Sequence, residues 1–314
     1  MKIFIEIPTW LGDAVMCTPA IENIVSIYPN CKLVIFGSFV STALFKYHPN
    51  IEKIIIDNSK KEGFRYINLY KLAKQIDHID MAFSFRKNFT TKYLLYFIDA
   101  KEKYIYKRMD SSNDTHQVIR YNQFVNDNLQ TSLKPNKLKI YTKDILKDTQ
   151  KRTLGINPGA TYGSAKRWYP KEFAKVCIEL SKEYNIKIFG GPNETNIAYD
   201  IEEQLKKNNI INYENLAGKT TIDELISFIS TLDMFITNDS GPMHVAAAFD
   251  IPTIAIFGPT RYKETSAWMN KNFILLRKDI SCSPCMKRVC PLKHHNCMKQ
   301  ITAQDVLDII KKII

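Results

Sequence analysis

Long apolar runs are missing from this 314-residue chain. No run reaches the roughly 18 apolar residues of a membrane-spanning helix, so we expect no transmembrane segment. The N-terminus lacks the longer apolar stretch and the small-residue cleavage site of a signal peptide, since Pro8, Trp10, Gly12 and Asp13 follow the first expected strand closely. We therefore expect a cytoplasmic protein. The seven cysteines, an odd number, agree with a reducing compartment.

Two nucleotide-binding motifs are also missing. The loop after the first expected strand contains no G-x-G-x-x-G, which counts against a dinucleotide dehydrogenase. The loop at residues 157–168 is not a Walker A loop, which counts against an ATPase. No low-complexity tract or short repeat appears, so the chain reads as an ordinary globular protein.

Positive charge is in excess. The chain has 44 Lys and Arg against 32 Asp and Glu, a formal net charge of +12. Such a balance suits a polyanionic partner, namely nucleic acid, an anionic membrane surface or a phosphorylated substrate. Composition does not choose among the three.

Short β-rich runs alternate with helical patterns nearly throughout, and the length predicts two domains. The pattern lapses between about residues 130 and 152 and then restarts. We therefore expect an α/β protein with two doubly wound, Rossmann-like domains, covering residues 1–150 and 151–301. Residues 302–314 form a final helix.

The first candidate site follows the first strand, where Gly12 and Asp13 open a helix. Ligands of doubly wound sheets bind beyond the carboxyl ends of the strands. Gly12 lets the backbone turn tightly into the helix. Asp13 has two interpretations that spacing does not separate: a helix cap or a catalytic carboxylate.

The second candidate site is the loop Asn157–Trp168 (NPGATYGSAKRW). Gly159 and Gly163 bring backbone N–H groups close to a ligand, Thr161 adds a hydroxyl, and Lys166 adds a cation. These are the parts of a phosphate cradle. The alternative is that Lys166 is one more solvated surface lysine.

The third candidate site leads into the small-residue helix after Thr237–His244 (TNDSGPMH). A helix N-terminus attracts anions, so Ser240 and Gly241 would direct N–H groups at a phosphate. Asp239 would accept hydrogen bonds from sugar hydroxyls. The alternative is a plain N-cap, with His244 packed under the helix.

Four cysteines fall within sixteen residues, at Cys282, Cys285, Cys290 and Cys297. Such a set in a cytosolic chain is compatible with structural Zn²⁺, but the spacing is not that of a ribbon or finger. A loop of reduced cysteines is the alternative, and the sequence does not decide between the two.

Basic residues cluster in the first half of the chain, and Arg86 and Lys87 follow an expected strand. With Arg120, they are candidates for binding an acidic substrate near Asp13. The alternative is a solvated charged face.

Taken together, Gly12-Asp13, the Asn157–Trp168 loop and Asn238–His244 (NDSGPMH) resemble glycosyltransferase family 9, the lipopolysaccharide heptosyltransferases. The likeness extends over nearly the whole chain. The second loop and the stretch Cys282–Cys297 look most like the members that add the second inner-core heptose. The resemblance implies a GT-B fold with the lipid A-linked acceptor on the N-terminal domain and ADP-heptose on the C-terminal one. It also implies that the final helix packs back on the N-terminal domain.

The resemblance implies roles for single residues. Asp13 is the general base and Lys166 meets the diphosphate. Further expected contacts are Gly12 near the base; Thr161 beside the diphosphate; Glu194, Lys219, Thr220 and Thr221 for the nucleoside; Asp239, Ser240, Gly241 and His244 for heptose and phosphates; and Arg86, Lys87 and Arg120 for the acceptor's anionic groups. No Asp-x-Asp pair occurs in the sequence, so the implied transfer is independent of a metal and free of a cofactor. Attack opposite the departing diphosphate would invert the anomeric carbon. The positive charge then suits a phosphorylated glycolipid at the cytoplasmic face of the inner membrane.

Two other functions stay open. One is another sugar-nucleotide enzyme of the same fold, such as an epimerase or the transferase of the first heptose. The other is a basic nucleic-acid-binding module, which requires a basic stripe with interleaved aromatics. The basic residues here are scattered, so we expect no nucleic-acid partner.

Overall fold

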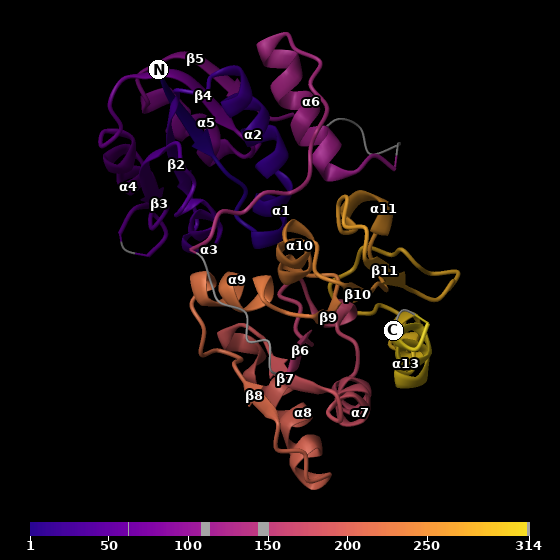
Figure 1. Cartoon of the computed structure of the whole chain (residues 1–314). Helices are drawn as coiled ribbons and strands as arrows, with labels where there is room; N and C mark the ends of the chain where they lie inside the picture. The colour runs from indigo at the N-terminus through magenta and orange to yellow at the C-terminus, as the bar shows by residue number, and fades with distance from the viewer. Residues whose placement is uncertain (62, 108–113, 144–150, 313–314) are drawn as a thin grey trace. The chain divides into compact units, whose positions relative to one another are not determined.

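The computed structural model describes residues 1–61, 63–107, 114–143 and 151–312. These residues belong to two compact units, Met1–Lys143 and Asp144–Ile314 (Figure 1). Each unit has its own parallel sheet and its own apolar core. In those ranges, the helices are too short or too polar to cross a membrane.

Unit 1 is built on a five-stranded sheet in the order β3-β2-β1-β4-β5. All of its pairings are parallel, because a helix or helical turn returns the chain to the same edge after each strand. The chain leaves β1 on one side toward β2 and later returns to its other side with β4, which makes a switch point beside β1.

The strands are β1 (Lys2–Glu6), β2 (Lys32–Gly37), β3 (Ile51–Ile56), β4 (Ile79–Ser84) and β5 (Ala100–Ile105). The helices are α1 (Leu11–Met16), α2 (Thr18–Ile27), α3 (Phe39–Thr42), η1 (Ala43–Phe45), α4 (Arg65–Ala73), α5 (Phe89–Phe97) and α6 (Gln117–Leu129).

The first predicted helix is in fact two helices, α1 and α2, that meet at Cys17. Pro19 has no N–H, so the carbonyl of Val15 loses the partner that an uninterrupted helix would give it. The Thr18 hydroxyl donates to that carbonyl at 2.8 Å instead. The carbonyl of Val15 therefore keeps a hydrogen-bond partner at the break.

Unit 2 carries a six-stranded parallel sheet in the order β11-β10-β9-β6-β7-β8. The two sheets confirm the predicted α/β fold of two doubly wound domains. The strands are β6 (Arg152–Asn157), β7 (Tyr184–Ile188), β8 (Tyr213–Asn215), β9 (Met234–Asn238), β10 (Thr253–Ile256) and β11 (Phe273–Leu276). The helices are η2 (Ser164–Lys166), α7 (Pro170–Leu180), η3 (Pro192–Glu194), α8 (Thr195–Lys207), α9 (Ile222–Ser230), α10 (Gly241–Ala248), α11 (Tyr262–Thr265), α12 (Asn296–Lys299) and α13 (Ala303–Ile310).

The final helix, α13, packs against α7 within unit 2. Ala303, Val306 and Ile310 form its buried stripe and belong to the core of this unit. The Glu172 carboxylate on α7 accepts a hydrogen bond from the N–H of Ala303 at 2.9 Å. The apolar stripe of this helix is therefore covered within unit 2. That the helix packs back on the N-terminal domain stays a prediction.

Candidate active site

The loop from Asn157 to Trp168 leaves the carboxyl end of β6, and the buried side chain of Asn238 ties its two ends together. The Asn238 Nδ2 donates to the carbonyl of Pro158 at 2.7 Å, and its Oδ1 accepts from the N–H of Trp168 at 3.0 Å. Asn238 ends β9, which lies next to β6. The neighbouring strand thus fixes both ends of the predicted phosphate loop.

Lys166 and Asp239 were predicted on separate loops, and the structure brings them together. The Lys166 Nζ lies 2.6 Å from Asp239 Oδ2, and both side chains are largely buried. The Thr260 hydroxyl donates to the same oxygen at 2.5 Å. The ring of Tyr162 lies 4.8 Å from the ammonium. The carboxylate therefore holds the Lys166 cation in one place, a form of preorganisation for a ligand that carries negative charge.

The N-terminus of α10 adjoins this ion pair in sequence. Ser240 stands at the N-cap, but its hydroxyl does not cap the helix. That hydroxyl instead lies 3.1 Å from the Thr237 hydroxyl and 3.3 Å from the Asn157 Nδ2. Because the side chain is turned away from the N–H groups of the first turn, the helix start that Gly241 opens suits an anion. His244 is buried in the same helix.

Glu194 is buried against the phosphate loop. Its Oε2 accepts from the N–H of Gly191 at 2.9 Å, while Oε1 is buried with no hydrogen-bond partner in the part of the chain that the structure describes. A methyl group added at Gly159 would overlap this carboxyl group, so the two loops are in close contact. A buried carboxylate oxygen without a hydrogen-bond partner is suited to accept a hydrogen bond from a ligand hydroxyl.

The residues predicted to line the nucleoside after β8 have local structural roles. The Thr221 hydroxyl caps α9 by accepting from the N–H of Glu224 at 3.2 Å. The exposed Lys219 donates to the carbonyl of Asn215 at 2.9 Å, and Thr220 between them is half-buried. Lys219 also borders a surface hollow of about 650 Å³ between α8 and β8. Lys166, Glu194 and Asp239 do not line that hollow, so it is separate from the phosphate loop.

The cysteine-rich segment braces the phosphate loop. The N–H of Ala165 donates to the carbonyl of Arg288 at 3.0 Å, and the Tyr162 hydroxyl donates to the carbonyl of Met286 at 2.7 Å. The His295 Nε2 lies 2.8 Å from the carbonyl of Ala165. The segment around the cysteines therefore shapes the backbone that presents Lys166, while Thr161 stays exposed at the tip of the loop.

The four cysteines line one small cavity and are all free thiols. Burial raises the pKa of the Cys297 thiol to about 11, and the thiols of Cys282, Cys285 and Cys290 add to the shift. Within residues 1–61, 63–107, 114–143 and 151–312, no set of three or more His, Cys, Asp or Glu side chains is arranged to hold a metal ion.

Asp13 stands in the first turn of α1, next to Gly12. The N-cap of this helix is Trp10, so Asp13 is not its capping residue. Burial raises the pKa of Tyr121 and of Cys17 well above their ordinary values, and the Asp13 carboxylate adds to both shifts. The half-buried carboxylate therefore lies close to two buried groups that remain neutral.

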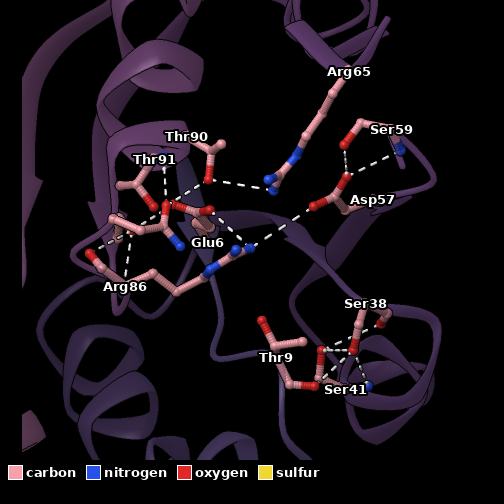
Figure 2. A network of polar contacts seen from close by, with 12 residues as sticks. Glu6, Thr9, Ser38, Ser41, Asp57, Ser59, Arg65, Arg86, Thr90 and Thr91 are labelled. Carbon is pink, nitrogen blue, oxygen red and sulfur yellow. Dashed lines mark hydrogen bonds and ion pairs between the residues drawn. The ribbon is translucent and has the colours of Figure 1, made fainter. Parts of the chain in front are cut away.

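Arg86 joins a buried ion network at the carboxyl edge of the unit 1 sheet (Figure 2). Its Nη1 lies 3.1 Å from Glu6 Oε1 and 3.8 Å from Asp57 Oδ2. Burial raises the pKa of Glu6, while Arg86 and the Ser84 hydroxyl, which donates to Glu6 at 2.5 Å, oppose that rise. The charge of Arg86 is thus balanced within unit 1.

The same network contains residues that the sequence analysis did not single out. The Arg65 Nη2 donates to the Thr90 hydroxyl at 3.4 Å, and Figure 2 shows the end of the Arg65 side chain between Thr90 and Asp57. Glu6 is the last residue of β1 and Asp57 directly follows β3. Their positions at strand ends could have identified them in the sequence as candidate site residues. Of the other predicted cations, Lys87 is exposed, and Arg120 is buried on α6 and engaged within the protein.

Comparison with known proteins agrees with this geometry. Residues 100–296 match the family described as glycosyltransferase family 9 (heptosyltransferase). The chain is 44% identical, over 100% of its length and 99% of the relative's, to lipooligosaccharide heptosyltransferase 2 of Campylobacter jejuni subsp. jejuni serotype O:6. It is 26% identical to the protein of the same name from Haemophilus influenzae, over 88% of each chain. The solved structure of E. coli ADP-heptose LPS heptosyltransferase II, at 21% identity, covers 99% of this chain and 98% of its own with a TM-score of 0.80, and so has the same GT-B fold. The chain therefore belongs to glycosyltransferase family 9, the heptosyltransferases, and is a glycosyltransferase.

Proposed function

We propose that this enzyme transfers heptose from ADP-L-glycero-β-D-manno-heptose to the lipopolysaccharide inner core, adding the second heptose to heptosyl-Kdo-lipid A. The observation that carries the proposal is the buried Lys166–Asp239 pair beside the N-terminus of α10, a site suited to a sugar diphosphate. The names of the relatives, which are heptosyltransferases 2, supply the sugar and the acceptor. By the same reasoning, the enzyme works as a peripheral protein at the cytoplasmic face of the inner membrane.

In this proposal, Lys166 and the α10 N-terminus bind the diphosphate of the donor. Asp239, held by Thr260 and Lys166, accepts hydrogen bonds from heptose hydroxyls, and Glu194 accepts one through its unsatisfied oxygen. Negative charge develops on the departing ADP, and the Lys166 cation and the helix N-terminus stabilise it.

Asp13 takes the proton of the acceptor hydroxyl as that oxygen attacks the anomeric carbon. The new C1–O bond forms while the bond to the diphosphate breaks, ADP leaves, and the anomeric configuration inverts. A positioned carboxylate in this role contributes typically about 10²–10⁴-fold to the rate. No step uses a metal or a cofactor.

The test is incubation of the protein with ADP-heptose and an acceptor that carries one heptose, followed by mass spectrometry. We expect one added heptose, and no product when the acceptor lacks the first heptose. Transfer to the acceptor without heptose would assign the enzyme to the first step. Release of a free sugar epimer without any acceptor would contradict transfer altogether.

Asp13→Asn keeps the size of the side chain and removes the base. We expect turnover to fall about 10²–10⁴-fold while ADP affinity stays at the wild-type value, because Asp13 and the donor residues belong to different units. Asp127→Asn, on α6 of the same unit, is the matched control and should leave both unchanged. Normal turnover of Asp13→Asn would remove this carboxylate from the mechanism.

A further inference from the structure

The helices α4 and α5 of unit 1 pack side by side, and exposed aromatic side chains lie on and beside them. Their inner residues, Leu69 and Leu72 on α4 and Leu94 and Leu95 on α5, belong to the core of the unit. The outer faces are different: Phe64 is 66% exposed, Phe89 68% and Tyr96 77%. Most soluble proteins keep such side chains covered, so a continuous exposed patch of them indicates a binding surface.

The exposed rings are connected to one another through the half-buried rings of Tyr66, Tyr93 and Phe97. The ring of Tyr66 lies 4.9 Å from that of Tyr93 and 6.0 Å from that of Phe89, and Tyr70 lies 5.0 Å from Phe97. Each of these pairs joins α4 to α5. We call this surface the aromatic face; it consists of Phe64, Tyr66, Ile67, Tyr70, Phe89, Tyr93, Tyr96 and Phe97.

The charge around the aromatic face has one sign. Residues 64–76 and 85–98 contain no Asp or Glu, yet they contain four Lys and two Arg. Lys71, Lys74, Lys87 and Lys92 are exposed. Unit 1 as a whole has 21 Lys and Arg against 13 Asp and Glu, or +8, whereas unit 2 has 23 against 19, or +4. The larger part of the net positive charge therefore belongs to the unit that carries the aromatic face.

We propose that the aromatic face is the surface by which the enzyme binds an anionic phospholipid bilayer. Tyr and Phe rings insert their apolar parts at the level of the headgroups, and lysines beside them contact anionic lipid phosphates. Lysine is depleted at protein–protein interfaces, so the exposed lysines favour a membrane over a protein partner. The proposal rests on the proposed function in one respect: a lipid-linked acceptor lies in a membrane.

The test is co-sedimentation of the full-length protein, without substrates, with vesicles of phosphatidylcholine alone or mixed with phosphatidylglycerol. We expect binding to the anionic vesicles that weakens with salt, and little binding to the neutral ones. The combined variant F64S/F89S/Y96S should reduce binding at least about tenfold, because three exposed apolar side chains are lost. Tyr199→Ser on α8 of unit 2, which removes a ring that is 55% exposed, is the matched control and should bind as the wild type does.

A second variant, K71Q/K74Q/K92Q, tests the charge independently of the rings and should remove most of the salt-sensitive part of the binding. Both variants should keep the wild-type Tm and ADP affinity, which separates lost binding from misfolding. Wild-type protein that does not bind anionic vesicles, or a ring variant that binds them undiminished, would overturn the proposal. So would a wild-type dimer that the ring variant converts to monomer while vesicle binding persists, because the occupant would then be a second copy of the chain.

Activity assays separate this proposal from the proposed function. On a deacylated, water-soluble acceptor the ring variant should turn over at the wild-type rate, whereas on an acceptor embedded in anionic vesicles its rate should fall at least about tenfold. If wild-type protein binds vesicles but transfers no heptose to either acceptor, the proposed function fails and the membrane surface stands. If the folded ring variant is inactive on the soluble acceptor as well, the aromatic face serves the acceptor sugar rather than the membrane, and the proposal fails.

Discussion

At the scale of single residues, the proposed donor site of unit 2 is a set of side chains that hold one another in place. One carboxylate oxygen of Asp239 pairs with the Lys166 ammonium and accepts a hydrogen bond from the Thr260 hydroxyl. The Asn238 side chain bonds to both ends of the loop that carries Lys166. Buried polar groups of this kind are stable only when they are satisfied together. A change at one of them is therefore expected to alter ligand binding before it alters the fold.

Lys166→Ala removes the cation that we assign to the diphosphate. We expect ADP affinity to fall at least about tenfold, since a charged hydrogen bond contributes about 1.5–3 kcal/mol. Isothermal titration calorimetry with ADP measures this affinity. Lys182→Ala is the matched control: Lys182 lies just after α7, its ion pair with Glu179 is exposed, and the change should leave ADP affinity unaltered. Unchanged ADP affinity in Lys166→Ala would contradict the assignment.

Gly159→Ala tests the contact between the phosphate loop and Glu194. The added methyl group would overlap the buried Glu194 carboxyl, so the loop or the carboxylate must move. We expect a loss of about 1–3 kcal/mol in the free energy of unfolding, as in other overpacked sites, and weaker ADP binding. Gly191→Ala is the control, because its methyl group would lie 3.6 Å from the same carboxylate, an ordinary contact. Equal behaviour of the two variants in denaturant titration would argue against this close packing.

At the scale of elements, burial decides whether a strand can be predicted from the sequence. Buried strands such as β1 and β9 are short runs of apolar residues and were predictable from that pattern. The edge strand β5 gives no such pattern, because Lys101, Glu102 and Lys103 are exposed and polar. The loops that carry Lys166 and Asp239 were found because each follows a strand. Their 2.6 Å contact was not predictable, because it depends on β6 pairing with β9, which are far apart in the sequence.

The docking of α13 on α7 gives a pH dependence at this scale. Burial raises the pKa of Glu172, but the hydrogen bond from the N–H of Ala303 and the Lys175 ammonium outweigh it, so the pKa lies below its ordinary value. A carboxyl group whose pKa is lowered by folding stabilises the protein above its ordinary pKa. This stabilisation is lost as the pH falls through the lowered value.

We therefore expect α13 to open more readily as the pH falls from neutral to below 4.5, the ordinary pKa of glutamate. Hydrogen exchange of the α13 amides, corrected for intrinsic rates, measures this opening. Glu172→Gln should flatten the pH dependence, because its amide does not titrate. Glu179→Gln on the exposed side of α7 should leave it as in the wild type, since an exposed ion pair contributes little. A pH dependence that is equally steep in Glu172→Gln would place its cause elsewhere.

At the scale of the whole molecule, the residues of the proposed mechanism are divided between the two units. Lys166, Asp239, Glu194 and the α10 N-terminus all lie in unit 2, and its apolar core is complete without unit 1. Asp13, the Glu6–Arg86 network and the aromatic face all lie in unit 1. Residues 151–314 also have a length typical of an independent domain.

This division predicts that residues 151–314, expressed alone, fold and bind ADP. We expect an affinity within about tenfold of that of the whole chain, a difference of at most about 1.4 kcal/mol. Transfer should be absent, because the proposed base belongs to unit 1. Titration of the fragment with ADP measures the affinity, and its Lys166→Ala variant shows whether the same site is used. A fragment that folds cooperatively but does not bind ADP would mean that unit 1 supplies a nucleotide contact, and the assignment of the donor to unit 2 alone would then be wrong.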